Sequence, residues 1–146
     1  MTRTIFFDMD GTIANLYGVE GWLESILARD EKPYKEAEVL LNMNSLARIL
    51  NRLQKEGNQI EIISWLAKDS TKEYDERVKE AKEKWLAKHL KSVKFNKINI
   101  VSYGTAKETF IHSNEDILFD DEERNRKNWT GKAYNVNSII ETLKSL

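Results

Sequence analysis

The feature that most constrains the fold is a series of short apolar runs separated by longer segments with helical spacing. Each run is too short for a helix of its own, and each is typical of a buried strand in a parallel sheet. Strands that alternate with helices form a parallel sheet that is covered on both faces. The sequence therefore predicts an α/β protein with a three-layer α/β/α, Rossmann-like parallel sheet. The expected strands are 4–7, 59–63, 98–101, 117–119 and 132–136.

Three of the intervening segments are expected to be helices. The first carries apolar residues at positions 46, 49, 50 and 53 and ends before Gly57. The second begins with a capping box of Ser70 and Glu73, and the third with the same pattern at Ser138 and Glu141. Along the second helix, the lysines from position 79 onward alternate with glutamates, which predicts a solvated face.

Length and composition fit one cytoplasmic domain. The 146 residues are enough for a single domain over 1–146, and only 14–45 are left for a short helical cap. No apolar run approaches the roughly 20 residues needed to cross a bilayer, so no membrane association is expected. The formal net charge of −1 argues against general binding to nucleic acid. The sequence has no cysteine, so thiolate metal sites are excluded, and oxygen ligands favour Mg²⁺.

Reactive side chains occur at the carboxyl ends of the expected strands. Asp8, Ser64 and Asp120 each follow a strand directly, and Lys107 follows the third strand after a turn. In open parallel sheets, ligands bind in the crevice at this edge. We therefore expect carboxylates, a hydroxyl and an ammonium group to meet in one site.

These residue types suit the transfer of a phosphoryl group through a covalent intermediate. A carboxylate that attacks a phosphate ester needs a cation between the two anions, and Mg²⁺ held by Asp8 and Asp120 would supply it. Asp8 is the expected nucleophile, while Asp10 would protonate the leaving oxygen and later deprotonate water. Ser64 and Lys107 would hold the phosphoryl oxygens.

The residues around these groups have supporting roles in the prediction. Gly11 is expected to turn the backbone tightly beside the phosphate and to leave backbone N–H groups free to donate. Asp121 is expected to orient metal-bound water from outside the ligand set.

The ordered motifs resemble those of the haloacid dehalogenase superfamily of phosphatases. The matching residues are the run from Asp8 to Thr12, then Ser64, Lys107 and the pair Asp120-Asp121. The resemblance implies a HAD-like fold, Mg²⁺ as cofactor, and the backbone carbonyl of Asp10 as a further metal ligand. It also implies phosphate contacts from Gly11, Thr12 and Trp65.

A narrower resemblance concerns the substrate. Asn125 and Trp129 after the acidic pair look similar to the 5′(3′)-deoxyribonucleotidase-like branch, in which Asn125 would support the metal site. The expected partner is thus a small phosphorylated substrate such as a nucleoside monophosphate. Two alternatives remain: a polynucleotide end phosphatase and a non-catalytic phosphate-binding protein. A homo-oligomer, in which a neighbour covers the lightly capped site, also stays open.

Overall fold

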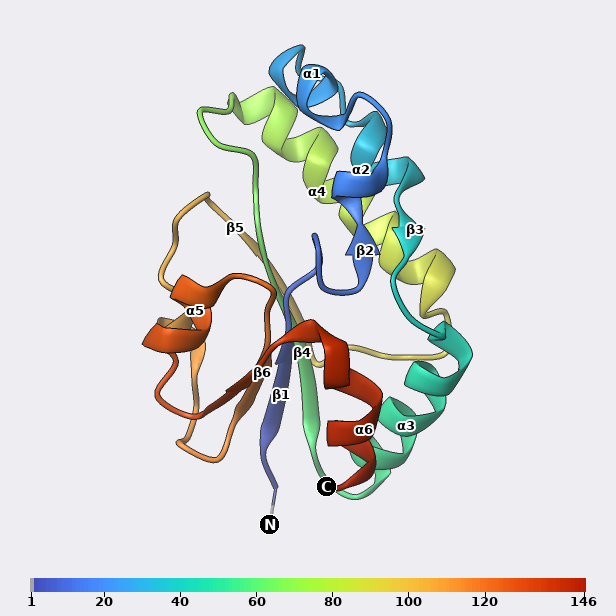
Figure 1. Cartoon of the computed structure of the whole chain (residues 1–146), viewed down its shortest axis with the longest axis vertical. Coiled ribbons are helices and arrows are strands. Elements are labelled where there is room, and N and C mark those ends of the chain that lie inside the picture. Colours follow the sequence, from blue (N-terminus) through green and yellow to red (C-terminus); the bar gives the residue numbers. More distant parts are fainter. Residues whose placement is uncertain (1) are drawn as a thin grey trace.

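Five parallel strands form the central sheet of this computed structural model, which describes residues 2–146 (Figure 1). The strand order is β5-β4-β1-β6-β7. The strands are β1 (Thr4–Phe7), β4 (Gln59–Trp65), β5 (Lys97–Val101), β6 (Ile117–Phe119) and β7 (Lys132–Tyr134). All five expected strands are confirmed, with ends that differ by at most two residues. One shift matters for the site, because Ser64 lies inside β4 rather than after it.

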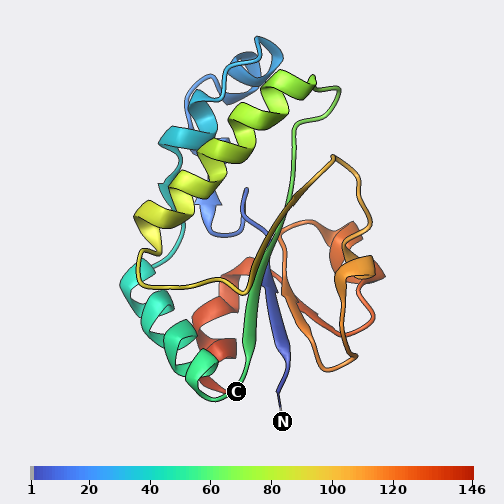
Figure 2. The same ribbon diagram turned by 180° about the vertical axis from the view of Figure 1, so that it is seen from behind.

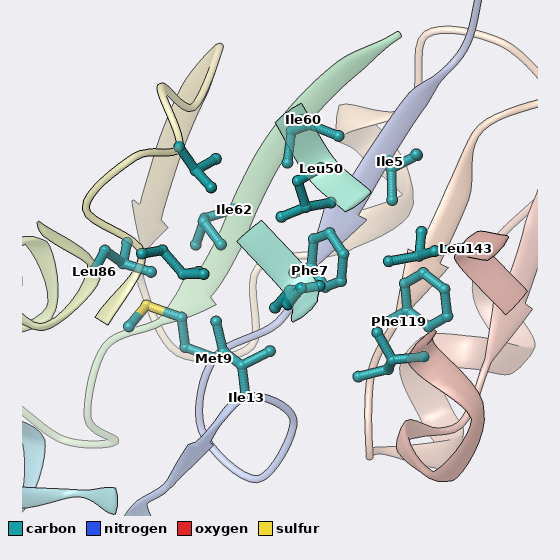
Figure 3. Close-up of a cluster of buried hydrophobic side chains, with 14 of the residues drawn as sticks. Ile5, Phe7, Met9, Ile13, Leu50, Ile60, Ile62, Leu86, Phe119 and Leu143 are labelled. Atoms are coloured by element: carbon teal, nitrogen blue, oxygen red, sulfur yellow. The ribbon is translucent and has the colours of Figure 1, made fainter. Parts of the chain in front are cut away.

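Side chains from β1 alternate between the two faces of the sheet, and each face has its own core. Ile5 and Phe7 join the larger cluster, together with Leu50 from α3 (Met43–Lys55) and Leu143 from α6 (Ile139–Lys144), as Figure 3 shows. Phe6 points the other way and packs with Trp129, which follows α5 (Glu123–Asn128). The predicted three layers are confirmed: α3 and α6 lie on one side of the sheet and α5 on the other (Figures 1 and 2).

The connection from β1 to α3 forms a small substructure beside the sheet edge. It contains β2 (Ala14–Asn15), η1 (Leu16–Gly18), α1 (Trp22–Leu27), α2 (Lys32–Glu36) and β3 (Glu38–Val39), and β2 pairs with β3 in antiparallel fashion. We call residues 14–39 the β1–α3 connection. Its helices lie against α4 (Lys72–His89), as Figure 2 shows. The shared core there consists of Leu16, Tyr34, Tyr74, Val78 and Ala81.

Three details of the helices differ from the sequence prediction. The N-cap of α4 is Thr71, whose side chain accepts a hydrogen bond from the Tyr74 N–H at 3.2 Å, so the expected Ser70 cap is wrong. Ser138 precedes α6 as expected, but its side chain makes no capping hydrogen bond. The predicted solvated face of α4 is also wrong at one position, because Lys82 is only 1% exposed. Among residues 2–146, no helix is both long and apolar enough to span a membrane.

Candidate active site

The carboxyl edge of the sheet brings the predicted polar residues together. Asp8 directly follows β1 and Asp120 directly follows β6, and these two strands pair in register from Ile5 to Phe7. Lys107 begins the 3₁₀ helix η2 (Lys107–Phe110), after the loop that leaves β5. The parallel pairing thus forces residues that are about a hundred positions apart in the chain into one site.

Lys107 joins the two strand-end carboxylates. Its ammonium donates to Asp8 Oδ1 at 2.9 Å and to Asp120 Oδ2 at 2.8 Å, and its side chain is 2% exposed. Burial disfavours the charge on Lys107, but the two carboxylates outweigh that effect and raise its pKa. The lysine is therefore a fixed cation, and it partly neutralises the repulsion between Asp8 and Asp120.

Thr12 holds the opposite side of Asp8. Its hydroxyl lies 3.0 Å from Asp8 Oδ2 and 3.4 Å from an oxygen of Asp121. The backbone N–H of Asp121 also points to the Thr12 oxygen, at 3.3 Å. Thr12 is 1% exposed, so it orients the carboxylates rather than facing open space.

Gly11 is required by the backbone beside these acids. Its φ is +81°, in the left-handed region, and a Cβ at this position would collide with the Asp121 carboxylate. The expectation of free backbone donors is wrong at Gly11 and Thr12. The Gly11 N–H donates to the carbonyl of Ala14 at 2.8 Å, and the Thr12 N–H to that of Met9 at 3.0 Å. The turn itself consumes these donors.

Asp10 and Ser64 are joined by a residue that the sequence analysis did not select. Lys82, on α4, donates to Asp10 Oδ2 at 2.9 Å, to Ser64 Oγ at 2.6 Å and to the carbonyl of Trp65 at 2.7 Å. Burial raises the pKa of Asp10, although Lys82 acts in the opposite direction. The signal for Lys82 was its spacing, since it follows the buried Val78 by four positions and so falls on the same helix face.

The acidic pair after β6 is held from several directions. The Asn125 amide donates to Asp120 Oδ2 at 3.0 Å, and the Glu122 N–H donates to Asp120 Oδ1 at 2.9 Å. Asn125 therefore lies beside Asp120, the expected metal ligand. Burial, together with the neighbouring Asp8 and Asp120, raises the pKa of Asp121 to about 8.

The donor set fits a divalent cation. Carboxylate oxygens of Asp8, Asp120 and Asp121 lie within 4.8 Å of one another. Hard oxygen ligands of this kind suit Mg²⁺. With Asp10 added, this edge holds four carboxyl groups, and within residues 2–146 their ion pairs involve two ammonium groups, those of Lys82 and Lys107. Burial is the main cause of the raised pKa of Asp121, and the neighbouring carboxylates of Asp8 and Asp120 add to it.

A cavity of about 530 Å³ opens from these groups toward the β1–α3 connection. Its polar end contains Asp8, Asp10, Lys107, Asp120 and Asp121. Apolar and aromatic side chains line much of the remainder, together with the polar residues Arg29, Lys68, Asp69, Glu122 and Asn125. Four of the aromatic lining residues form two edge-to-face pairs, with ring centroids 4.9 Å and 5.1 Å apart. These pairs are Tyr17 with Trp22, and Trp65 with Tyr103.

Trp65 lines this cavity with its ring and is anchored by its polar atoms. Its indole N–H donates to the carbonyl of Thr105 at 2.9 Å. Lys107 and Arg124 place their cationic groups 5.4 Å and 5.1 Å from its ring centroid. The ring is therefore a fixed wall of the cavity, close to the Lys107 ammonium.

Comparisons with known proteins bear on the fold. No model of a known protein family matches the sequence, and no curated protein matches it. The structure is similar to the crystal structure of D,D-heptose 1,7-bisphosphate phosphatase from Burkholderia thailandensis, with a TM-score of 0.55. The alignment covers 98% of this chain and 97% of that chain at 10% sequence identity. At this identity the similarity establishes a shared fold, which agrees with the three-layer α/β/α architecture described above.

Proposed function

We propose that this protein is a Mg²⁺-dependent phosphomonoester hydrolase that forms an aspartyl-phosphate on Asp8. The observation that carries the proposal is the placement of Asp8, which is fixed between Lys107 and Thr12 and lies beside a second pair of acids. Asp8 is 7% exposed and lines the cavity, so its carboxylate is accessible from one side only. The phosphatase fold of the similar crystal structure agrees with this chemistry.

The side chains divide the reaction between them. An oxygen of Asp8 attacks phosphorus as the ester bond breaks, and Asp10 gives a proton to the leaving oxygen. Asp10 then takes a proton from the water that attacks phosphorus, and inorganic phosphate leaves Asp8 free. Ser64 and Lys107 stabilise the charge on the transferring phosphoryl group.

Mg²⁺ would be held by the carboxylates of Asp8 and Asp120 together with the backbone carbonyl of Asp10. When bound, the ion supplies positive charge that offsets the repulsion between the nucleophile and the phosphate. Asp121 and Asn125 would orient the ligands and the water around it. The excess of carboxylates over ammonium groups at this edge supports the assignment.

For the substrate, we propose a small phosphate ester with a planar leaving group, such as a nucleoside monophosphate. The β1–α3 connection would act as the cap over this group. Support comes from the aromatic lining of the cavity, because flat rings bind by stacking on such side chains. Tyr17 and Tyr103 are 51% and 50% exposed, which leaves their ring surfaces available for contact.

Phosphate release from an aryl phosphate in the presence of Mg²⁺ tests the proposal. We expect Asp8→Asn to abolish the activity, because an amide is a poor nucleophile and cannot form the intermediate. Glu80→Gln is the matched control, since it makes the same carboxylate-to-amide change on an exposed surface of α4. Retained activity in Asp8→Asn would overturn the assignment of the nucleophile.

A panel of phosphorylated compounds tests the substrate class. It should contain nucleoside 5′- and 3′-monophosphates, sugar phosphates and short 3′-phosphorylated oligonucleotides. We expect the highest kcat/KM among the nucleoside monophosphates. A preference for the oligonucleotides would instead identify a polynucleotide end phosphatase, and a preference for sugar phosphates would exclude stacking as the source of specificity.

A further inference from the structure

Lys82 enters the candidate active site from the middle of α4, and nothing in the assigned chemistry uses it. A lysine ammonium has three N–H donors and no acceptor. Here each donor has one partner: Asp10 Oδ2, Ser64 Oγ and the carbonyl of Trp65, at distances of 2.9, 2.6 and 2.7 Å. The ammonium therefore has no proton left for a substrate. With 1% of its side chain exposed, it also lies behind the residues that face the cavity.

We propose that Lys82 is a positioning residue that decides which atoms of Asp10 and Ser64 present a proton to the substrate. The proposal rests on the proposed function, because it assigns Lys82 a part in that reaction. It concerns two different groups, a carboxyl and a hydroxyl, that one ammonium holds at the same time.

At Asp10, the ammonium distinguishes the two carboxyl oxygens. Lys82 donates to Oδ2, and a proton on that oxygen would face another donor. The proton of the acid form therefore sits on Oδ1. Asp10 is 16% exposed and lines the cavity, so the remaining exposure is on the side away from the buried lysine. The contact thus turns the proton-bearing oxygen toward the leaving group.

At Ser64, the same contact sets the direction of the hydroxyl. Because Lys82 can only donate, Ser64 Oγ must accept, and the hydroxyl hydrogen points elsewhere. Ser64 is fully buried within β4, so its side chain has little freedom to choose another arrangement. The hydroxyl hydrogen is consequently left for an acceptor other than Lys82, and the proposal assigns it to a phosphoryl oxygen of the bound substrate.

The proton balance follows from these assignments. As the bond from Asp8 to phosphorus forms, the ester P–O bond breaks and the proton on Asp10 Oδ1 moves to the leaving oxygen. Asp10 Oδ1 then receives a proton from the attacking water, while the bond between phosphorus and Asp8 breaks. Lys82 keeps its three protons throughout, so it acts only by holding Asp10 Oδ2 and Ser64 Oγ.

Lys82 also connects this proton donor to the β1–α3 connection. Its ammonium lies 5.1 Å from the ring centroid of Tyr34 on α2, which is within the range of a cation–π contact. Tyr34 is 5% exposed and lines the same cavity. The aromatic ring covers the ammonium on the side toward this connection, which helps to fix its direction.

Substrates with different leaving groups distinguish a positioning role of Lys82 from a purely structural one. A substrate with a good leaving group, such as 4-nitrophenyl phosphate, needs no protonation as its ester bond breaks, whereas an alkyl phosphate does. We expect Lys82→Met to lower kcat for the alkyl phosphate about 10-fold or more beyond its effect on the nitrophenyl ester, within the range of general acid catalysis. An equal loss on both substrates would overturn the proposal.

Double variants sharpen this test. If Lys82 acts through Asp10, Asp10→Asn shows the same dependence on the leaving group, and adding Lys82→Met to it changes the ratio of the two rates no further. Independent, multiplying effects would contradict the assignment. Lys79→Met, an exposed change on the same helix, is the control and should leave both rates unchanged.

A binding measurement covers Ser64 and does not depend on turnover. With inorganic phosphate as the probe and Mg²⁺ present, we expect Lys82→Met and Ser64→Ala each to weaken phosphate binding several-fold. The double variant should bind phosphate no more weakly than either single variant. If Lys82→Met does not fold, Lys82→Gln keeps a donor of similar reach, and it should show a smaller leaving-group effect. Unchanged phosphate affinity in the folded variant would refute the role at Ser64. Failure of the Asp8→Asn test, by contrast, would refute the proposed function itself.

Discussion

Removing the Lys107 ammonium should lower the free energy of unfolding, and the burial of its two carboxylate partners determines by how much. In Lys107→Met the aliphatic part of the side chain is retained, but the carboxylates of Asp8 and Asp120 lose their shared cation. Both groups are almost inaccessible to water, with side-chain exposures of 10% and 1%. Loss of one partner from a buried ion pair typically lowers stability by about 3–5 kcal/mol. Since domains are stable by only about 5–15 kcal/mol, the variant should lie close to its unfolding threshold.

Urea denaturation followed by tryptophan fluorescence, in buffer without divalent cations, measures this change. Lys84→Met is the matched control, because Lys84 is 74% exposed and its surface pairing with Glu80 should contribute little to stability. Burial raises the pKa of Asp120 and Lys107 acts in the opposite direction, so without Lys107 this pKa rises further above that of the unfolded chain. The stability of the variant therefore falls as pH rises above about 4, and its deficit is larger at pH 7.5 than at pH 5.

Mg²⁺ should restore part of the lost stability, since the cation supplies the charge that the lysine carried. A deficit below about 1 kcal/mol at pH 7.5, or one that is independent of pH, would refute the view that Lys107 neutralises these acids.

Three further predictions concern the metal, the first turn and the core. Because the pKa of Asp121 is about 8 in the metal-free protein, Mg²⁺ binding should release a proton, and the affinity for Mg²⁺ should rise from pH 6 to pH 8. Calorimetry in buffers of different ionisation enthalpy measures the number of protons released. Binding of Mg²⁺ without proton release would contradict this prediction. Gly11→Ala should lower stability by about 1–3 kcal/mol and exceed the effect of Gly104→Ala, which shares the positive φ but has open space around it. Leu50→Ala should lower the free energy of unfolding by about 2–5 kcal/mol, as thermal or urea unfolding would show, whereas Leu27→Ala, 71% exposed, should change it little.

The fold could be predicted because its signals are local and repeat along the chain. Continuous apolar runs specify buried strands, and the buried pattern of β1 and β6 matches this expectation at every residue. The parallel arrangement then places Asp8 and Asp120 side by side without any further information. Strand ends and helix caps were less predictable, because they depend on which of several neighbouring polar groups reaches the backbone.

The burial of Lys82 and the hydrogen bonds of the turn after β1, which contains Gly11 and Thr12, could not be predicted from the sequence. The lysine sits among charged residues whose alternation is typical of a solvated surface, and only its partners across the fold explain its burial. The N–H groups of Gly11 and Thr12 looked free, but the turn that Gly11 permits uses them internally. Both features arise from contacts between distant elements, which periodicity along one segment does not encode.

The most direct test of the central claim is to trap the covalent intermediate. The protein is mixed with Mg²⁺ and an excess of substrate and quenched in acid within the first turnovers. Peptide mass spectrometry then locates the added phosphoryl group. We predict that it is found on Asp8, in the peptide that contains the run from Asp8 to Thr12, and that Asp8→Asn carries none. A phosphoryl group on another residue, or full turnover by Asp8→Asn, would contradict the account.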